Sequence, residues 1–384
     1  MALLLGLQPV ATDVYLPALP QLTQSLAAPM SAAQLTMSAL ILAFGISQLV
    51  WGPVADRVGR RPVLLAGLTL FTLAGLGSAL AGSIEVLVLW RIVQGVALAA
   101  AVVCARAMVR DLYEPVTGAR VMSMAMSGLA VIALTGPSIG GAVAAAFGWR
   151  AALLLVALAG LATLAFVVWQ LPETVRQRNP RATRAGPLLA AWASMLAHPV
   201  FRAWTLLTAC TYGGLFTVLA ASPFVYMQVL GISSAAFGLT LAWGSGVYLA
   251  ATFVGRRWIM HHGMAGSVTR GAGFSLAGGL VALVATRVDG GHLWWLLAAH
   301  GLYAFGHGIH QPCGQAGAVG PFPHAAGAAS ALAGFVLALV AFAIGLWLGV
   351  ALDGTVRALA WGISFWSVAT AAVAWTLVRR HVAH

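Results

Sequence analysis

The stretch "GPVADRVGRRP", residues 52–62, joins two apolar segments that are each long enough to cross a bilayer. Its glycines permit a tight reversal of the chain, and its charged side chains can form ion pairs with neighbouring helix ends. Arginines in so short a connection also anchor membrane topology, but topology alone does not explain the order of the residues. The candidate functional residues of this loop are Gly52, Asp56, Arg57, Gly59, Arg60 and Arg61.

The composition around this loop is that of an integral membrane protein. Hydrophobic residues make up 61% of the 384 residues and charged residues only 7%, and the mean hydropathy is +0.94. A soluble chain carries roughly a quarter of its residues charged, because its surface faces water. This chain has too few charges for such a surface, so most of its surface must face lipid.

Apolar segments of spanning length recur along the chain. A helix needs about 20 apolar residues to cross a bilayer, and membrane strands would give weaker, alternating segments of about ten residues. The sequence therefore predicts an all-α protein with twelve transmembrane helices. These lie near 3–26, 32–53, 62–81, 86–109, 118–145, 150–171, 202–229, 235–256, 267–286, 293–317, 325–350 and 356–378.

The net charge of +12 comes from arginine alone and is concentrated in the short connections. This distribution is typical of topology-setting charge at a cytoplasmic face and not of a nucleic-acid-binding surface. Only Arg150, Arg287 and Arg357 fall on the opposite side, so we expect both termini in the cytoplasm. The arginines assigned to that side are Arg57, Arg60, Arg61, Arg110, Arg120, Arg176, Arg178, Arg181, Arg184, Arg202, Arg256, Arg257, Arg270, Arg379 and Arg380.

The longest polar connection, "LPETVRQRNPRATRAGP" at 171–187, lies midway along the chain. Val-Gly-Arg-Arg occurs at 58–61 and again at 254–257, at equivalent places in the two halves. We therefore expect an N-terminal six-helix bundle, a cytoplasmic linker and a C-terminal six-helix bundle, with the substrate site between the bundles. Their expected bounds are 1–171, 172–201 and 202–384.

Asp13 and Arg91 are ionisable side chains that fall inside predicted spans of the first half. Asp13 interrupts the apolar stretch "PVATDVYLPALPQL", 9–22, and Arg91 and Gln94 lie one turn apart in "WRIVQG". A charge at the centre of a spanning helix costs about 2.5–3.5 kcal/mol, so both charged side chains should face the bundle interior. For Arg91 the alternative is that it extends to the outer interface.

The fifth predicted helix carries closely spaced glycines and a proline in "GLAVIALTGPSIGGAVAAAFGWR", 128–150. Glycines at four-residue spacing let a neighbouring backbone approach, and proline weakens the helix locally. Plain helix packing would also explain the glycines. The candidate residues are Gly128, Gly136, Pro137, Gly140 and Gly141.

The order Gly-x-x-x-Asp-Arg-x-Gly-Arg-Arg resembles the loop between helices two and three of the major facilitator superfamily, and the predicted topology agrees over the whole chain. The resemblance implies that Asp56 and Arg60 join a cytoplasmic gate, with Asp111 of "RDLYEP" as a partner. The second copy, around Arg256, lacks the aspartate.

Further motifs resemble the drug:proton antiporters of this superfamily. Arg-x-x-Gln-Gly from Arg91 resembles a helix-four signature linked to proton transfer, and Gly-Pro-x-x-Gly-Gly from Gly136 resembles the antiporter signature, which favours export over import. "TDVYLPA", with Asp13 and Tyr15, and "GPFPHAAGAASALAGF", 320–335, resemble the bicyclomycin-resistance and chloramphenicol-efflux branch.

The resemblance implies a proton-coupled multidrug efflux antiporter of the bacterial inner membrane, in which Asp13 carries the proton. We expect a monomer without cofactor, driven by the proton gradient, that exports small hydrophobic or cationic drugs by alternating access. The alternatives are a proton-coupled importer of a small metabolite and a non-transporting membrane scaffold. We expect no enzyme, since nucleophiles, bases and metal ligands are not clustered.

Two groups of residues remain as weaker candidates. His300, His307 and His310 could titrate in a cavity, but their spacing and the lack of nearby carboxylates argue against a metal site. Aromatic side chains could stack on a flat substrate, although packing explains them more simply. They are Tyr212, Tyr226 and Trp243.

Overall fold

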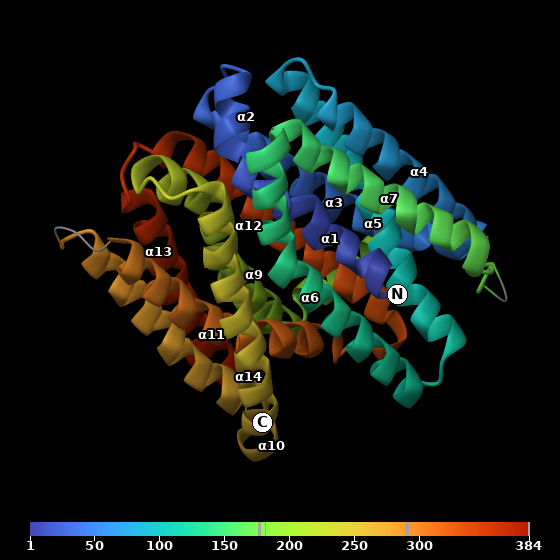
Figure 1. Ribbon diagram of the computed structural model, residues 1–384. Helices are drawn as coiled ribbons and strands as arrows, with labels where there is room; N and C mark the ends of the chain where they lie inside the picture. The colour runs from blue at the N-terminus through green and yellow to red at the C-terminus, as the bar shows by residue number, and fades with distance from the viewer. Residues whose placement is uncertain (176–177, 181, 289–291, 383–384) are drawn as a thin grey trace.

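The computed structural model describes residues 1–175, 178–180, 182–288 and 292–382. Two of the arginines assigned to the cytoplasmic side, Arg176 and Arg181, lie outside these ranges. The described residues form helices and connections without strands, as the sequence predicts. Figure 1 shows the helices of the first half on one side of the molecule and those of the second half on the other.

The described ranges contain fourteen α-helices. They also contain short 3-10 helices at Leu16–Ala18 and Pro323–Ala325 and π-helices at Pro223–Val229 and Ala374–Val378. The α-helices are α1 Ala2–Asp13, α2 Leu19–Ser25, α3 Met30–Val58, α4 Arg60–Ala79, α5 Ile84–Leu112, α6 Pro115–Phe147, α7 Trp149–Gln170, α8 Ala185–Ala197, α9 Pro199–Ser222, α10 Ser234–Ala285, α11 His292–Val319, α12 Ala326–Ala351, α13 Arg357–Val373 and α14 Arg379–Val382.

Ten helical segments of the described chain are long and apolar enough to cross a membrane. One of them, α10, has 52 residues, which is about 78 Å of helix against a hydrocarbon core of about 30 Å. It is broken at Gly263, whose φ is +66°, and so supplies two crossings. The 28-residue α11 is more polar but is also long enough to cross, so the helices of the described ranges supply the twelve crossings that the sequence predicts.

The break in α10 differs from the loop that the sequence predicts between 256 and 267. The chain stays helical there except at Gly263. A positive φ is accessible to glycine because it has no Cβ atom, so one residue is enough to redirect the helix.

The first span is broken in its middle. α1 ends at Asp13, a 3-10 helix covers Leu16–Ala18, and α2 continues to Ser25. Pro17 and Pro20 occupy first-turn positions of the two later helices, where a missing N–H and a fixed φ do no harm. The prolines after Asp13 therefore favour the end of α1 at Asp13.

The two halves meet along pairs of long helices, and α3 packs along α12 while α6 packs against α10. Small residues line the contact between α3 and α12. A Cβ atom added at Gly45 would overlap Ala338, and one added at Gly345 would overlap Ser38. We call this contact the α3–α12 seam, and its small residues let the two backbones approach closely.

The connection between the halves contains a helix that the sequence does not predict. α8 has 13 residues, about 20 Å, which is too short to cross a bilayer. It packs on α9 and α12 of the second half.

Candidate functional site

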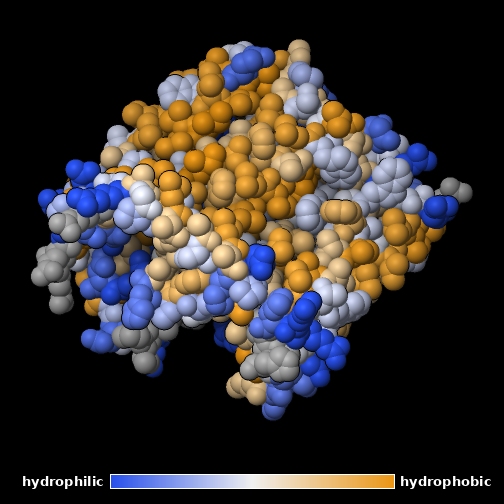
Figure 2. All heavy atoms as spheres, turned by 180° about the vertical axis from the view of Figure 1, so that it is seen from behind, coloured by the Kyte–Doolittle hydropathy of each residue, from blue (hydrophilic) through white to orange (hydrophobic). Residues whose placement is uncertain are grey.

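A cavity of about 1200 Å³ lies between the two halves, with walls from α3, α5, α6, α8, α11 and α12. Its lining includes two of the four charged residues of the quoted loop, Asp56 and Arg60, together with Asp111 and Trp192. We call this part of the lining the rim. Figure 2 shows hydrophilic residues gathered on both sides of a notch at one end of the molecule, while the middle is hydrophobic. The cavity therefore opens on the arginine-rich side.

A smaller cavity of about 120 Å³ continues inward from it and reaches Gln8 and Thr12 of α1. The two cavities share lining residues, including Gln48, Arg106 and Ser330. Thr12 precedes the half-buried Asp13. A continuous path therefore leads from the charged rim toward the break in the first span.

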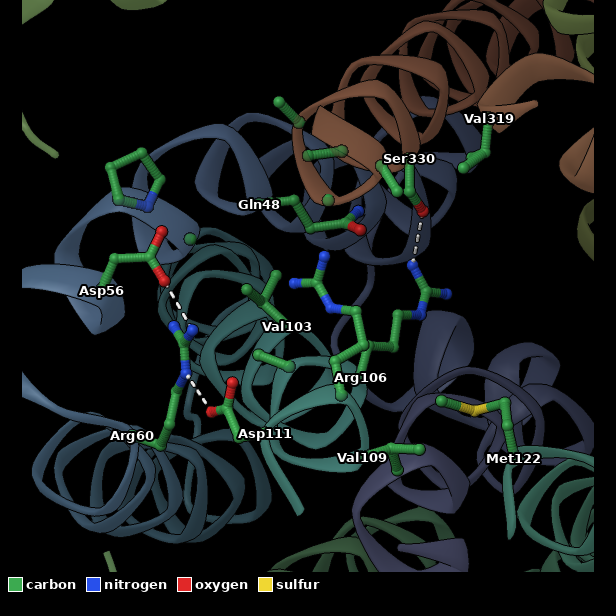
Figure 3. Close-up of a pocket in the computed structure, with 18 of the residues that line it drawn as sticks. Gln48, Asp56, Arg60, Val103, Arg106, Val109, Asp111, Met122, Val319 and Ser330 are labelled. Atoms are coloured by element: carbon green, nitrogen blue, oxygen red, sulfur yellow. Dashed lines mark hydrogen bonds and ion pairs between the residues drawn. The ribbon is translucent and has the colours of Figure 1, made fainter. Parts of the chain in front are cut away.

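The charged residues of the rim form one cluster. Arg60 makes ion pairs with Asp56, one turn earlier, and with Asp111 at the end of α5, where Nε and Oδ2 are 3.1 Å apart. The hydroxyl of Thr174 donates to the same oxygen of Asp111 at 3.1 Å. Figure 3 shows Asp56 and Asp111 on either side of Arg60. The three residues that the resemblance assigns to a gate are thus brought together.

Glu173 completes this cluster, and sequence reasoning missed it. Its carboxylate accepts from the backbone N–H groups of Arg60 at 3.0 Å and Arg61 at 3.2 Å, so it caps the start of α4, where carboxylates are favoured. Gly59 lies at that helix boundary with φ +119°, and a Cβ atom there would overlap the carboxylate. The one sequence feature that could have indicated this role was an acidic residue at the start of the polar connection 171–187.

Partial burial raises the pKa of Glu173, but the backbone N–H groups that donate to it outweigh burial and hold the pKa below its ordinary value of 4.5. Two of these donors, Thr174 and Val175, follow it in the chain at 2.9 and 3.0 Å. The carboxylate is therefore ionised at neutral pH and fixes the start of the connection to α4.

Three other residues of the quoted loop contact neighbouring segments of the chain. Arg61 donates to the carbonyl oxygens of Leu171 at 2.9 Å and Val168 at 3.1 Å, at the C-terminus of α7. Arg57 donates to the hydroxyl of Thr183 at 2.9 Å. Gly52 faces Val103 of α5. The loop thus joins α3 and α4 to the start of the connection between the halves.

Arg91 is fully buried inside the first half and does not extend to the interface. It donates to the carbonyl oxygens of Ala11 at 2.7 Å and Thr36 at 3.2 Å, and to Oε1 of Gln94 at 2.6 Å. Its guanidinium also lies over the ring of Tyr15, 4.0 Å from the centroid. Its charge is thus balanced by carbonyl oxygens and a ring face, which attract cations.

Asp13 lies at the end of α1 and is half-buried. Its Oδ1 accepts from the hydroxyl of Thr12 at 2.6 Å. Within the described ranges it makes no ion pair, with Arg91 or any other base. The nearby hydroxyl of Tyr15 lies 3.2 Å from that of Thr36. No basic side chain of the described ranges therefore neutralises the charge of Asp13.

The glycines of α6 lie against the first span and the second half. Gly128 faces Ala2, and Gly136 and Gly140 face Val14, the residue after Asp13. Gly141 lies against the backbone of Ser234 at the start of α10. Pro137 lies within the same helix. The glycines of α6 thus pack against the break in the first span, beside Asp13.

The histidines of α11 form a polar cluster in the second half. The hydroxyl of Thr211 lies 3.0 Å from Nδ1 of His307 and 3.4 Å from Nδ1 of His310, and Nε2 of His310 lies 3.1 Å from the carbonyl oxygen of Val268. His300 packs on Gly244. All three imidazoles are buried, and neighbouring groups occupy three of their nitrogens.

The aromatic candidates have different surroundings. Tyr212 lines the inner cavity, where it can contact a substrate. Tyr226 packs edge-on against Phe237, and Trp243 donates to the carbonyl oxygen of Leu297 at 3.1 Å. Only Tyr212 of the three is therefore placed on the path between the halves.

Comparison with known families gives one match that covers most of the chain. The model of the Major Facilitator Superfamily matches residues 1–346. Among solved structures, that of a D-xylose-proton symporter shares the fold, with a TM-score of 0.77 at 18% sequence identity, and covers 98% of this chain and 95% of its own.

Three curated bacterial relatives are drug-resistance proteins by name. Multidrug resistance protein D of Escherichia coli is 32% identical over 87% of this chain and 83% of its own length. The chloramphenicol resistance protein of Pseudomonas aeruginosa is 32% identical over 83% and 75%. A bicyclomycin resistance protein homolog of Haemophilus influenzae is 25% identical over 91% and 86%.

Proposed function

Because the chain belongs to the major facilitator superfamily, whose members are multi-pass membrane transporters, we propose that it is a proton-coupled drug exporter of the bacterial inner membrane. The observation that carries this proposal is its similarity to three drug-resistance relatives over most of their length. The cavity between the halves, open at one end, supports the same function, since transporters of this architecture bind substrate there.

The proposed mechanism uses Asp13 as the proton carrier. Arg91 is balanced by carbonyl oxygens and Tyr15, so Asp13 is not held as a permanent counter-ion and can gain and lose a proton. Drug enters from the arginine-rich side and reaches the inner cavity beside Thr12. Exchange requires that drug occupies the inner cavity while Asp13 is ionised, and that Asp13 is protonated once the cavity is empty.

Alternating access then exchanges the two ligands. When the halves rock and the cavity opens to the opposite side, drug leaves and Asp13 takes up a proton from the more acidic side. The return step carries that proton inward. Each charge that moves through 100 mV contributes about 2.3 kcal/mol, so the proton gradient can drive export without a cofactor.

The orientation and oligomeric state belong to the proposal. The arginine-rich rim is assigned to the cytoplasm, which places both termini there, and the two halves of one chain enclose the cavity, so a monomer suffices. Cysteine labelling at Arg178→Cys in intact and permeabilised cells tests the orientation. Labelling in intact cells would reverse it.

Proton exchange is tested with purified protein in proteoliposomes that contain a pH-sensitive dye. Chloramphenicol added on the cytoplasmic side should drive proton movement in the wild type and in Asp353→Asn, which changes an exposed loop carboxylate. The same flux should be absent in Asp13→Asn. Undiminished drug-dependent proton flux in Asp13→Asn would exclude Asp13 as the carrier.

A further inference from the structure

Arg106 lies on α5 where the outer and inner cavities meet. It comes 15 residues after Arg91 on the same helix, about 22 Å along the axis, and therefore lies far from Asp13 and near the charged rim. Any substrate that moves from the rim to the inner cavity passes its guanidinium. Figure 3 shows Arg106 among the lining side chains, bonded to Ser330 of the opposite half.

The charge of Arg106 is not neutralised by a carboxylate in the described part of the chain. Its Nη1 donates to the hydroxyl of Ser330 at 3.1 Å, whereas Asp56 and Asp111 are paired with Arg60. A guanidinium has five N–H donors, so one neutral hydroxyl leaves most of its donors to water or substrate. This differs from Arg91, which has three acceptors and a ring face.

The inner cavity around Arg106 is otherwise neutral. Among its described lining residues Arg106 is the one charged side chain, and no aspartate or glutamate is present. The other polar groups near it are the amides Gln48, Gln311 and Gln315 and the hydroxyl of Ser330. A positive charge in a cavity with low-dielectric walls attracts anions and repels cations.

We infer that Arg106 is a substrate-binding residue that receives an anionic oxygen group, such as a carboxylate, sulfonate or phosphonate. The planar guanidinium fork matches such groups with two parallel hydrogen bonds, and the amides can supply further donors. Acidic and neutral drugs are then preferred over cationic ones, which narrows the range expected from the sequence. This inference rests on the proposed function, since it assigns the substrate class of the same cavity.

Three probes of different charge test the preference. Binding of carboxyfluorescein, rhodamine 6G and chloramphenicol to the purified protein is measured by tryptophan quenching, and export of each by proteoliposomes. The wild type should bind the anion about tenfold more tightly than the cation, because a hydrogen-bonded ion pair is worth at least that factor. Arg106→Gln should lose this preference and keep chloramphenicol binding within about twofold.

Two further variants separate substrate binding from a link between the halves. Arg106→Lys keeps the charge but not the fork and should retain part of the preference, and Ser330→Ala removes the hydroxyl and should retain all of it. Equal losses for all three probes in Arg106→Gln, or the same profile in Ser330→Ala, would overturn the inference. Proton-coupled chloramphenicol export without an anion preference would remove the inference alone, whereas no export of any probe would remove the proposed function as well.

Discussion

The guanidinium of Arg91 lies over the ring of Tyr15, 4.0 Å from its centroid, and no carboxylate of the described chain contacts it. Arg91 lies in α5, and Tyr15 lies in the turn between α1 and the 3-10 helix at Leu16–Ala18. Arg91 also binds the carbonyl oxygen of Ala11 in the last turn of α1. The buried charge is thus compensated by the partial negative charge of a helix C-terminus and a ring face.

This arrangement predicts that lysine cannot replace Arg91. A single ammonium cannot reach Ala11, Thr36 and Gln94 in the geometry of the fork, so Arg91→Lys should lose proton-coupled export. Arg91→Met should also lower the free energy of unfolding by several kcal/mol, since it removes three hydrogen bonds to a charged group, each of which contributes about 1.5–3 kcal/mol. Thermal unfolding in detergent and export assays measure both effects.

The matched control is Arg287→Lys, which changes an exposed arginine in a connection. It should leave unfolding and export unchanged. Wild-type export by Arg91→Lys would show that charge alone is sufficient at this position.

Gly140 should not tolerate even alanine. A Cβ atom there would overlap the backbone of Val14, next to Asp13, and would push the break in the first span away from α6. Gly140→Ala should therefore reduce export at least about tenfold, although alanine favours helices over glycine by about 1 kcal/mol. Export rates at equal protein density in proteoliposomes measure the effect.

Gly246→Ala serves as the comparison, because a Cβ atom at this helical position meets no atom within 4 Å. It should keep full activity and gain slightly in stability. Equal export by the two variants would contradict the assigned contact between α6 and the first span.

The cap that Glu173 forms on α4 predicts a pH-dependent contribution to stability. Its pKa lies below the ordinary value of 4.5 in the folded protein, so the ionised carboxylate stabilises the fold above that value. The contribution disappears as the pH falls through the lowered pKa. Glu173→Gln should melt below the wild type at pH 7, because the ionised cap is lost. The difference should be only a few degrees, because water screens the exposed carboxylate.

The comparison is made by melting both proteins from pH 7 to pH 3. The gap between them should close at the acidic end of this range. A gap that stays constant across the whole range would show that the ionised form makes no special contribution.

The ion pairs of Arg60 predict unequal effects of two similar substitutions. The side chain of Asp111 is 24% exposed and that of Asp56 is 48% exposed, and an exposed pair contributes little. Asp111→Asn should therefore disturb the gate more than Asp56→Asn. Cysteine accessibility at the rim during transport measures gate opening, and equal labelling of the two variants would contradict this order.

Much of the fold followed from the sequence, because membrane crossing imposes length and hydropathy on each helix. The exceptions have separate causes. Gly263 turns the chain with one residue in place of a loop, and α8 forms on the second half, where contacts that no single sequence reveals stabilise it. The break after Asp13 could be expected from Pro17 and Pro20.

The site was less predictable, because it depends on contacts between distant segments. The motifs placed Asp56, Arg60 and Asp111 in one cluster, and the structure brings them together. Glu173 and Arg106 carry no comparable pattern, since each acts on a segment far away in the sequence. The roles of Asp13, Arg91 and the α6 glycines in transport stay predictions.

The α3–α12 seam has a consequence for how this protein tolerates mutation. In most soluble proteins the least replaceable positions are the largest buried side chains, because their loss leaves cavities. At the α3–α12 seam, glycines instead lie against alanine and serine, and such small side chains interlock less than large ones when the halves move. We expect a saturation mutagenesis survey to find that substitutions at the smallest residues of this seam reduce turnover most while folding stays intact. Some of the chain's 44 glycines would then serve movement and not stability.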